Sequence, residues 1–88
     1  MNSEDALDRL KKGEIYGYVV EEALKKYPRN EVRQAIVEGK ERGIKEMEEE
    51  MKKDAGLRDI YPTLIEDCKK EIEALKAGKK VSYGGTIV

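Results

Sequence analysis

The chain has 88 residues, and its 18 lysines and arginines nearly balance its 19 aspartates and glutamates. A chain of this length forms one domain, so we expect residues 1–88 to be a single domain. Each half of the sequence is balanced as well, which argues against a basic domain that binds polyanions and against an acidic mimic of nucleic acid. The charge therefore speaks against nucleic acid as a partner.

Membrane and export signals are missing from the sequence. No run approaches the roughly 20 apolar residues that a membrane-spanning helix needs. The first residues, MNSEDALDRL, lack the basic start and apolar middle of a signal peptide. The one cysteine, Cys68, cannot form an intrachain disulfide, which is typical of a reducing compartment. We therefore expect a cytoplasmic protein without a membrane partner.

Two short helices are expected at the start of the chain. Ser3 is a suitable N-cap residue for the first, and Gly13 ends it. A second helix follows over residues 14–27 (or continues the first, if Gly13 is tolerated), and Pro28 ends it. The first helix has three apolar residues on its inner face: Ala6, Leu7 and Leu10.

A long helix over residues 31–54 is expected next, with Asn30 as its N-cap. At 1.5 Å per residue it would extend roughly 36 Å, which is long for a domain of this size. Gly39 and Gly43 lie inside it, although glycine costs about 1 kcal/mol relative to alanine in a helix interior. The alternative is a loop at EGKERG, residues 38–43, between two shorter helices.

The long helix carries two apolar stripes. Gly39 and Gly43 form a smooth groove on one face, which another helix can approach closely. A second stripe repeats every seven residues, as in coiled coils. We expect the chain's own helices to cover one stripe and a second chain to cover the other, which gives a homodimer. The predicted partner-binding residues of this helix are Val37, Gly39, Gly43, Ile44, Met47 and Met51.

A fourth helix is expected from Asp59, as its N-cap, to Ala77, with Pro62 in the first turn and Gly78 as the stop. Six of its residues form one apolar face: Tyr61, Leu64, Ile65, Cys68, Ile72 and Leu75. The fold expected from residues 1–78 is an all-α bundle of three to four helices.

In the tail, residues 79–88, the helical spacing of apolar residues ends and a strand-like pattern begins. Gly84–Gly85 can supply the positive φ angles of a two-residue hairpin turn between short strands at 81–83 and 86–88. Such short strands need a surface to lie on, either the chain's own or a partner's. The last three residues also match the pattern that PDZ domains bind by strand addition, so Ile87 and Val88 are candidate partner-binding residues.

Few residues in the sequence suit catalysis. Without histidine, the commonest general base and the His-containing metal sites are lost. Cys68 lies within an apolar face, where a small buried side chain belongs. The acidic run at Glu46–Glu50 fans around its helix, which is typical of a solvated surface. The glycines match no phosphate-binding loop. We expect no enzyme activity, no cofactor and no metal site.

Five tyrosines, without phenylalanine or tryptophan, are an uneven choice of aromatic residues. Tyr16, Tyr27 and Tyr61 lie on apolar stripes, so we expect them to be partly buried. Tyr18 lies off its stripe and Tyr83 lies beside the glycine turn. These two are the candidates for stacking on a ligand or filling a pocket of a partner.

Residues 73–81, EALKAGKKV, resemble the helix-to-strand opening of a phage family that counters the Thoeris defence by sequestering a nucleotide signal. The resemblance covers nine residues, and no aromatic–asparagine–glycine continuation follows them. It assigns a role to no residue. It implies that a sequestering or inhibitory function belongs among the alternatives.

The sequence thus favours a small non-catalytic protein-binding module, an adaptor, regulator or inhibitor, that self-associates through the long helix. A second hypothesis is a small-molecule or nucleotide-binding or sequestering protein, a class that includes the phage-encoded anti-defence type, with tyrosines at a protomer interface. A nucleic-acid-associated regulator is third, because Lys79–Lys80 is the longest basic feature outside the mixed-charge helices.

Overall fold

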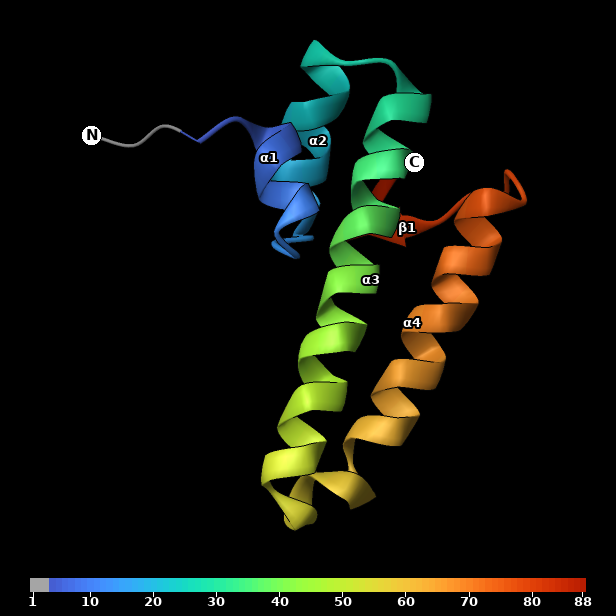
Figure 1. Cartoon of the computed structure of the whole chain (residues 1–88). Helices are drawn as coiled ribbons and strands as arrows, with labels where there is room; N and C mark the ends of the chain where they lie inside the picture. The colour runs from blue at the N-terminus through green and yellow to red at the C-terminus, as the bar shows by residue number, and fades with distance from the viewer. Residues whose placement is uncertain (1–3) are drawn as a thin grey trace.

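The computed structural model describes residues 4–88, which form a helical bundle with a small C-terminal hairpin (Figure 1), as the sequence predicts. The described part contains four α-helices, one 3-10 helix (η1) and two strands. Their bounds are α1 Ala6–Lys11, α2 Gly17–Lys26, α3 Arg29–Lys53, η1 Ala55–Asp59, α4 Tyr61–Lys76, β1 Ser82–Tyr83 and β2 Thr86–Ile87.

The long helix α3 is the spine of the molecule. Helix α4 runs antiparallel beside it, and α1 and α2 lie against only its first half (Figure 1). The second half of α3 is flanked by η1 and α4 alone, so this end of the molecule is a two-helix arm. The principal dimensions of 41 × 36 × 19 Å reflect this extended arm.

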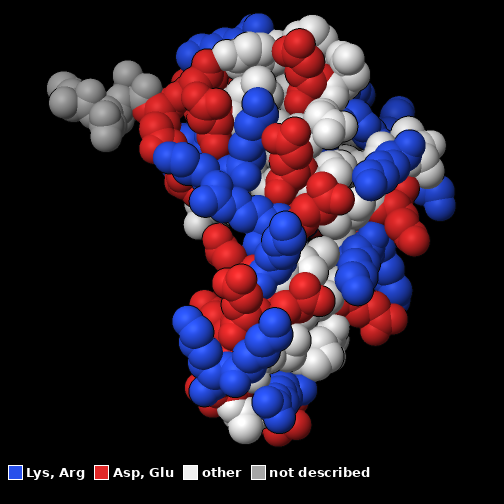
Figure 2. Space-filling view, in the orientation of Figure 1, with Lys and Arg blue, Asp and Glu red and all other residues white. Residues whose placement is uncertain are grey.

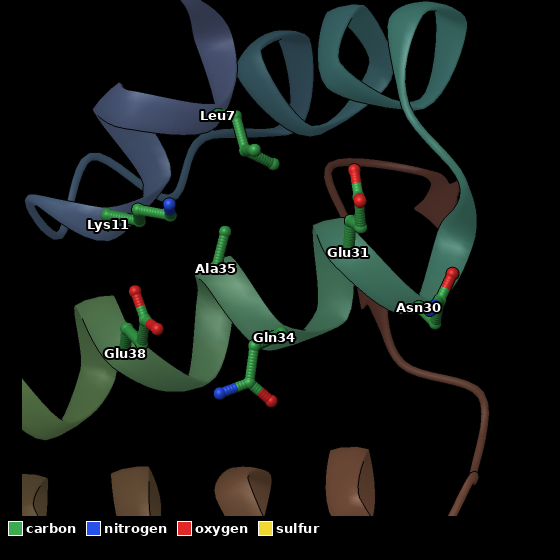
Figure 3. Close-up of a pocket in the computed structure, with 7 residues that line it drawn as sticks. All are labelled: Leu7, Lys11, Asn30, Glu31, Gln34, Ala35 and Glu38. Carbon is green, nitrogen blue, oxygen red and sulfur yellow. The ribbon is translucent and has the colours of Figure 1, made fainter.

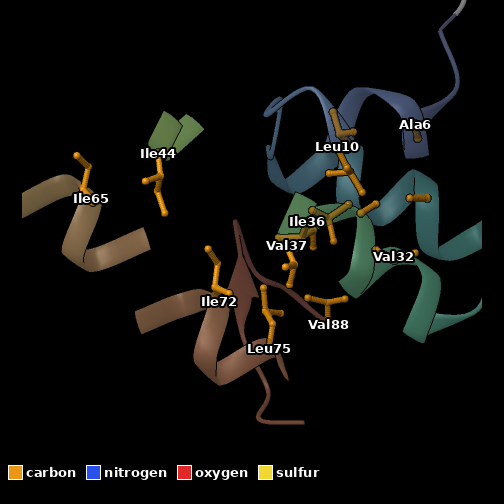
Figure 4. Close-up of a cluster of buried hydrophobic side chains, with 14 residues drawn as sticks. Ala6, Leu10, Val32, Ile36, Val37, Ile44, Ile65, Ile72, Leu75 and Val88 are labelled. Atoms are coloured by element: carbon orange, nitrogen blue, oxygen red, sulfur yellow. The ribbon is translucent and has the colours of Figure 1, made fainter. Parts of the chain in front are cut away.

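The buried core has two parts, which meet along α3 (Figure 4). One part lies between α3 and the first two helices, and it consists of Ala6, Leu10, Val19, Val20, Ala23, Val32, Ala35 and Ile36. The other lies between α3, α4 and the hairpin, and it consists of Val37, Ile44, Ile65, Ile72, Leu75 and Val88. Burying both sets removes much apolar surface from water, which is the main source of stability in so small a domain.

Helix α3 is continuous through both glycines, so the alternative of a loop at residues 38–43 is wrong. Gly39 is buried where α1 ends on α3, and a Cβ there would lie 2.0 Å from the Leu10 carbonyl oxygen. Gly43, one turn later, has no other atom within 4 Å of the same position. The close helix crossing expected at the two glycines therefore exists at Gly39, within one chain, and is absent at Gly43.

Three predicted N-caps differ from the structure. Ser3 lies outside the described residues, and Asp5 caps α1 by accepting a hydrogen bond from the Leu7 N–H at 3.1 Å. Asn30 lies inside α3, which begins after Pro28, whose carbonyl accepts the first intrahelical bonds. Asp59 ends η1, and the N-cap of α4 is Ile60. Both of these helices begin without a side-chain cap, so the cap-forming residues of the sequence predicted the wrong first residue for each helix.

Helix α2 begins at Gly17, later than predicted, because residue 16 is still extended. Tyr27, which follows its last turn, donates a hydrogen bond to the Asp5 carboxylate and ties the start of α1 to the end of α2. This bond, with that from the Leu7 N–H, holds the pKa of Asp5 below its usual range. The stops at Gly13 and Gly78 and the proline in the first turn of α4 are confirmed.

The C-terminal strands pair with each other, as predicted. Ser82 lies opposite Ile87 and Tyr83 opposite Thr86, and the turn glycines Gly84 and Gly85 both have positive φ, at 55° and 89°. Positive φ at both turn positions suits the right-handed twist of a tight hairpin. The hairpin packs on the chain's own helices, so the surface that its strands need is supplied in cis.

Arg33 of α3 fastens the tail to the helices. Its guanidinium donates hydrogen bonds of 2.7 Å to three carbonyl oxygens, those of Leu75, Lys79 and Val88. These acceptors come from the end of α4, the connection and the hairpin. One cation therefore links the end of α4, the connection and the hairpin, beside the backbone N–H groups of Gly78 and Val81 that also donate to Leu75 and Val88, and it holds the second part of the core closed.

Alanine at the two α3 glycines should have opposite effects. Gly39→Ala forces the α1 backbone away from α3, and overpacking of this kind costs about 1–3 kcal/mol, against a helix-propensity gain of about 1 kcal/mol. At Gly43 the methyl group meets open space, so Gly43→Ala should stabilise by about 0.4–1 kcal/mol. Urea unfolding followed by circular dichroism measures both. Equal shifts in the two variants would contradict the crossing at Gly39.

Removing the Arg33 charge should weaken the fold markedly. Arg33→Met keeps an apolar stem but loses three charge-assisted hydrogen bonds, and we expect a loss of about 2–4 kcal/mol. Arg42→Met is the matched control, because Arg42 is exposed and, among residues 4–88, forms an ion pair only with Glu46 of the same helix; its effect should stay within about 0.5 kcal/mol. Similar losses in the two variants would show that Arg33 does not fasten the tail.

Candidate functional site

Two tyrosines stack at the start of α2 and face solvent. The rings of Tyr16 and Tyr18 are parallel within 4°, with centroids 6.0 Å apart, and the residues are 55% and 62% exposed. Gly17 between them touches the hairpin: a Cβ there would lie 2.7 Å from the Tyr83 carbonyl oxygen. The close backbone contact at Gly17 fixes the segment that carries both rings.

An arginine and a glutamate hold this pair. Arg9 donates hydrogen bonds of 3.0 and 3.2 Å to Glu14 and one of 3.1 Å to the Tyr18 hydroxyl. Its guanidinium carbon lies 5.4 Å from the centre of the Tyr18 ring, within the range of a cation–π contact. We call Arg9, Glu14, Tyr16 and Tyr18 the tyrosine platform. It is preorganised, since each of its four side chains contacts another.

The sequence identified only part of this platform. Tyr18 is exposed, as its position off the stripe predicts. The expectation that Tyr16 is partly buried is wrong, because the residue precedes α2 and the helical phase does not apply to it. Tyr27 and Tyr61 are half-buried, as expected. A glycine between two tyrosines at a helix start was the available signal for the platform.

The premise for self-association through α3 is wrong. Val37 and Ile44, on the second stripe, are buried against α4, and Gly39 is covered by α1 (Figure 4). Met47 and Met51 are half-buried against the same core. One chain therefore covers most of both stripes, with Gly43 left open, and a homodimer through α3 stays a prediction without its original reason.

The two candidate partner-binding residues at the end of the tail lie in different environments. Ile87 is 52% exposed on the outer side of the hairpin, whereas Val88 is fully buried in the core and its carbonyl oxygen is held by Arg33. Val88 is thus not a free surface in this structure, and strand addition to a PDZ domain would require the tail to leave its place. Ile87 alone remains available to a partner.

Tyr83 is directed inward rather than toward a ligand. Its hydroxyl is buried without a hydrogen-bond partner among residues 4–88. Burial raises the pKa of Tyr83, and the nearby Glu71 carboxylate on α4 raises it further. Lys40 forms an ion pair with Glu71 and lies 5.6 Å from the centre of the Tyr83 ring. The residue therefore closes the space between the hairpin, α3 and α4.

A groove of about 480 Å³ lies between α1 and the first half of α3 (Figure 3). Its lining is mostly polar and of both charges: Leu7, Lys11, Asn30, Glu31, Gln34, Ala35 and Glu38. Leu7 points into the groove, while Gln34 points away from α1, toward α4. Ligand pockets are usually closed and largely apolar, so this open groove is a poor site for a small molecule.

Other features of the described residues add little chemistry. Within residues 4–88, no three histidine, cysteine, aspartate or glutamate side chains group as a metal site requires. No helix in that range combines the length and apolar character needed to cross a membrane. Figure 2 shows basic and acidic side chains interleaved over α3 and α4, with no large region of one sign on this face.

Comparisons with protein-family models, curated proteins and solved structures find no match to this chain. The geometry of its own residues therefore has to carry the functional argument.

Replacing Tyr83 should show how its buried hydroxyl affects the stability of the fold. Tyr83→Phe removes an unpaired polar group, so the variant should be as stable as the parent at pH 7 or about 1 kcal/mol more stable. Because the folded pKa is raised, the unfolded chain loses the phenolic proton first above about pH 10, and the parent then loses stability as pH rises. Urea unfolding at pH 7 and pH 10.5 compares the two. Parallel pH profiles would contradict the buried environment.

Proposed function

We propose that this chain is a small non-catalytic protein-binding module, an adaptor, regulator or inhibitor, that docks a partner through the tyrosine platform. The observation that carries the proposal is the exposed, stacked pair Tyr16 and Tyr18, held by Arg9 and Glu14. Tyrosine and arginine are enriched at the energetic centres of protein interfaces, and rings fixed before binding lose little entropy on docking.

The surroundings of the platform support the same proposal. Exposed Ile87 comes from β2, a strand that packs against α2, so the neighbouring element also offers an apolar side chain to a partner. The depression beside Tyr18, of about 470 Å³, is open and bordered by Glu21, Glu22, Lys25 and Lys26. An apolar centre with a rim of both charges is the usual composition of a protein interface. The proposal includes a cytoplasmic location, which is supported by the single cysteine of the sequence.

A nucleotide-binding or sequestering function is the second candidate, favoured by the aromatic rings themselves, on which a base can stack. It fits the geometry less well. The Tyr18 ring already contacts Tyr16 and Arg9, and a base would have to replace one of these contacts. The depressions near the platform are open rather than enclosed.

Site-specific photocrosslinking tests the proposal in cells of the source organism. A photoreactive phenylalanine analogue at Tyr18 should yield one defined crosslinked protein, whereas the same analogue at Lys69, on the charged outer face of α4, should not. With that protein purified, Tyr16→Ala and Tyr18→Ala should each weaken binding at least tenfold, as hot-spot residues do, and leave the thermal unfolding curve nearly unchanged.

Two results would overturn this function. One is equal crosslinking from positions 18 and 69, which would mark the contacts as nonspecific. The other is a thermal shift with a nucleotide panel that Tyr18→Ala abolishes, which would favour the second candidate.

A further inference from the structure

A second surface lies on the two-helix arm, away from the tyrosine platform. Two polar contacts cross from α3 to α4 on the same side of the arm. Lys40 pairs with Glu71 at one end, and the Tyr61 hydroxyl donates a 2.8 Å hydrogen bond to Glu50 at the other. These contacts frame a short stretch of each helix.

The residues between the two contacts follow the same spacing on both helices. Steps of three, four and three residues lead from Lys40 to Glu50 on α3 and from Tyr61 to Glu71 on α4, so they stay on one face of each helix. Because the helices are antiparallel, the framed residues face each other in pairs across the arm. The pairs are Gly43 with Cys68 and Met47 with Leu64; together we call these four residues the arm window.

The arm window is apolar and uncovered. Leu64 is 44% exposed, although its position on the apolar face of α4 predicts burial, and Met47 and Cys68 are half-buried. Above Gly43 there is open space. Ile60, one turn before Leu64, is 57% exposed and extends the apolar surface toward the end of the arm. Burial of Leu64 fails because α1, α2 and the hairpin stop before this part of the arm (Figure 1).

The shape of the arm window suits another helix. Gly39, one turn earlier on α3, lets the α1 backbone approach within contact distance. Gly43 continues the same row and offers the same close approach, but nothing in the described chain uses it. From Gly43 to Glu50 the distance is roughly 10 Å, so a helix of two to three turns would cover the window.

The charges at its border select a basic occupant. Four carboxylates adjoin the window: Glu46, Glu50, Asp67 and Glu71. Lys40 compensates Glu71 and Arg42 compensates Glu46, whereas Glu50 and Asp67 have no basic partner within the described range. A second copy docking face to face would bring acidic borders together, and such like-charge contacts disfavour association.

We propose that the arm window binds an amphipathic helix of another protein, with small and apolar residues at its centre and lysine or arginine on both sides. In this mode of recognition an amphipathic helix lays its apolar face on an apolar surface. It uses a surface separate from the tyrosine platform, so the two proposals can fail independently.

Two synthetic peptides of about 15 residues, long enough to form a helix, test the proposal. They share one Leu/Ala stripe, and lysine flanks it in one peptide and glutamate in the other. Titration of the chain with ¹³C-methyl-labelled methionine should shift the Met47 methyl signal with the lysine peptide. The glutamate peptide should bind at least tenfold more weakly.

Variants in the chain show where the peptide binds. Gly43→Leu, which fills the open space, and Leu64→Lys should each weaken the lysine peptide at least tenfold without loss of helical signal. Tyr18→Ala is the matched control on the other surface and should bind the peptide as the parent does.

Three outcomes would overturn the proposal. Neither peptide binds, or binding survives both Gly43→Leu and Leu64→Lys. The third is a chain that sediments as a dimer at micromolar concentration and becomes a monomer with Leu64→Lys, which would assign the arm window to a second copy of the chain.

Discussion

The backbone contact between α1 and α3 at Gly39 is the constraint on which the rest of the structure depends. It lets the first two helices sit close enough to α3 to bury their small apolar residues, since a side chain at this position would hold the helices apart. With that face occupied, only the opposite stripe of α3 is left for α4. One helix can then serve as the spine of two core layers in a chain of 88 residues.

The same constraint determines which part of α3 has no covering helix on this face. Helix α1 is short, and its end lies against Gly39 of α3, so α1 covers no part of α3 beyond this residue. Beyond this point α3 packs, among the described residues, against α4 and η1 alone. The tyrosine platform lies apart from the arm, at the start of α2 beside the hairpin turn. The chain thus presents two apolar surfaces that differ in kind, one aromatic and rigid, the other aliphatic with a glycine.

Periodicity predicted the helices and most of the core, because each apolar stripe packs as its spacing requires. It could not show how far along α3 the neighbouring helices extend, and Leu64 is exposed for that reason. Nor could it show that most of both stripes of α3 would be covered in cis, since this depends on how α1 and α4 return to α3. Tyr16 was misplaced because a helical phase was applied outside a helix.

The Arg33 contacts have a consequence for the order of folding. Helices α1 to α3 can pack from contacts close in sequence, whereas Arg33 meets Val88 across 55 positions of the chain. During synthesis, domains fold as their segments emerge, and distant contacts form last. We therefore expect the α3–α4 layer to close beside the hairpin in a late step of folding, when the tail reaches Arg33. Until that step Val37 and Leu75, which are buried in the folded chain, stay in contact with water.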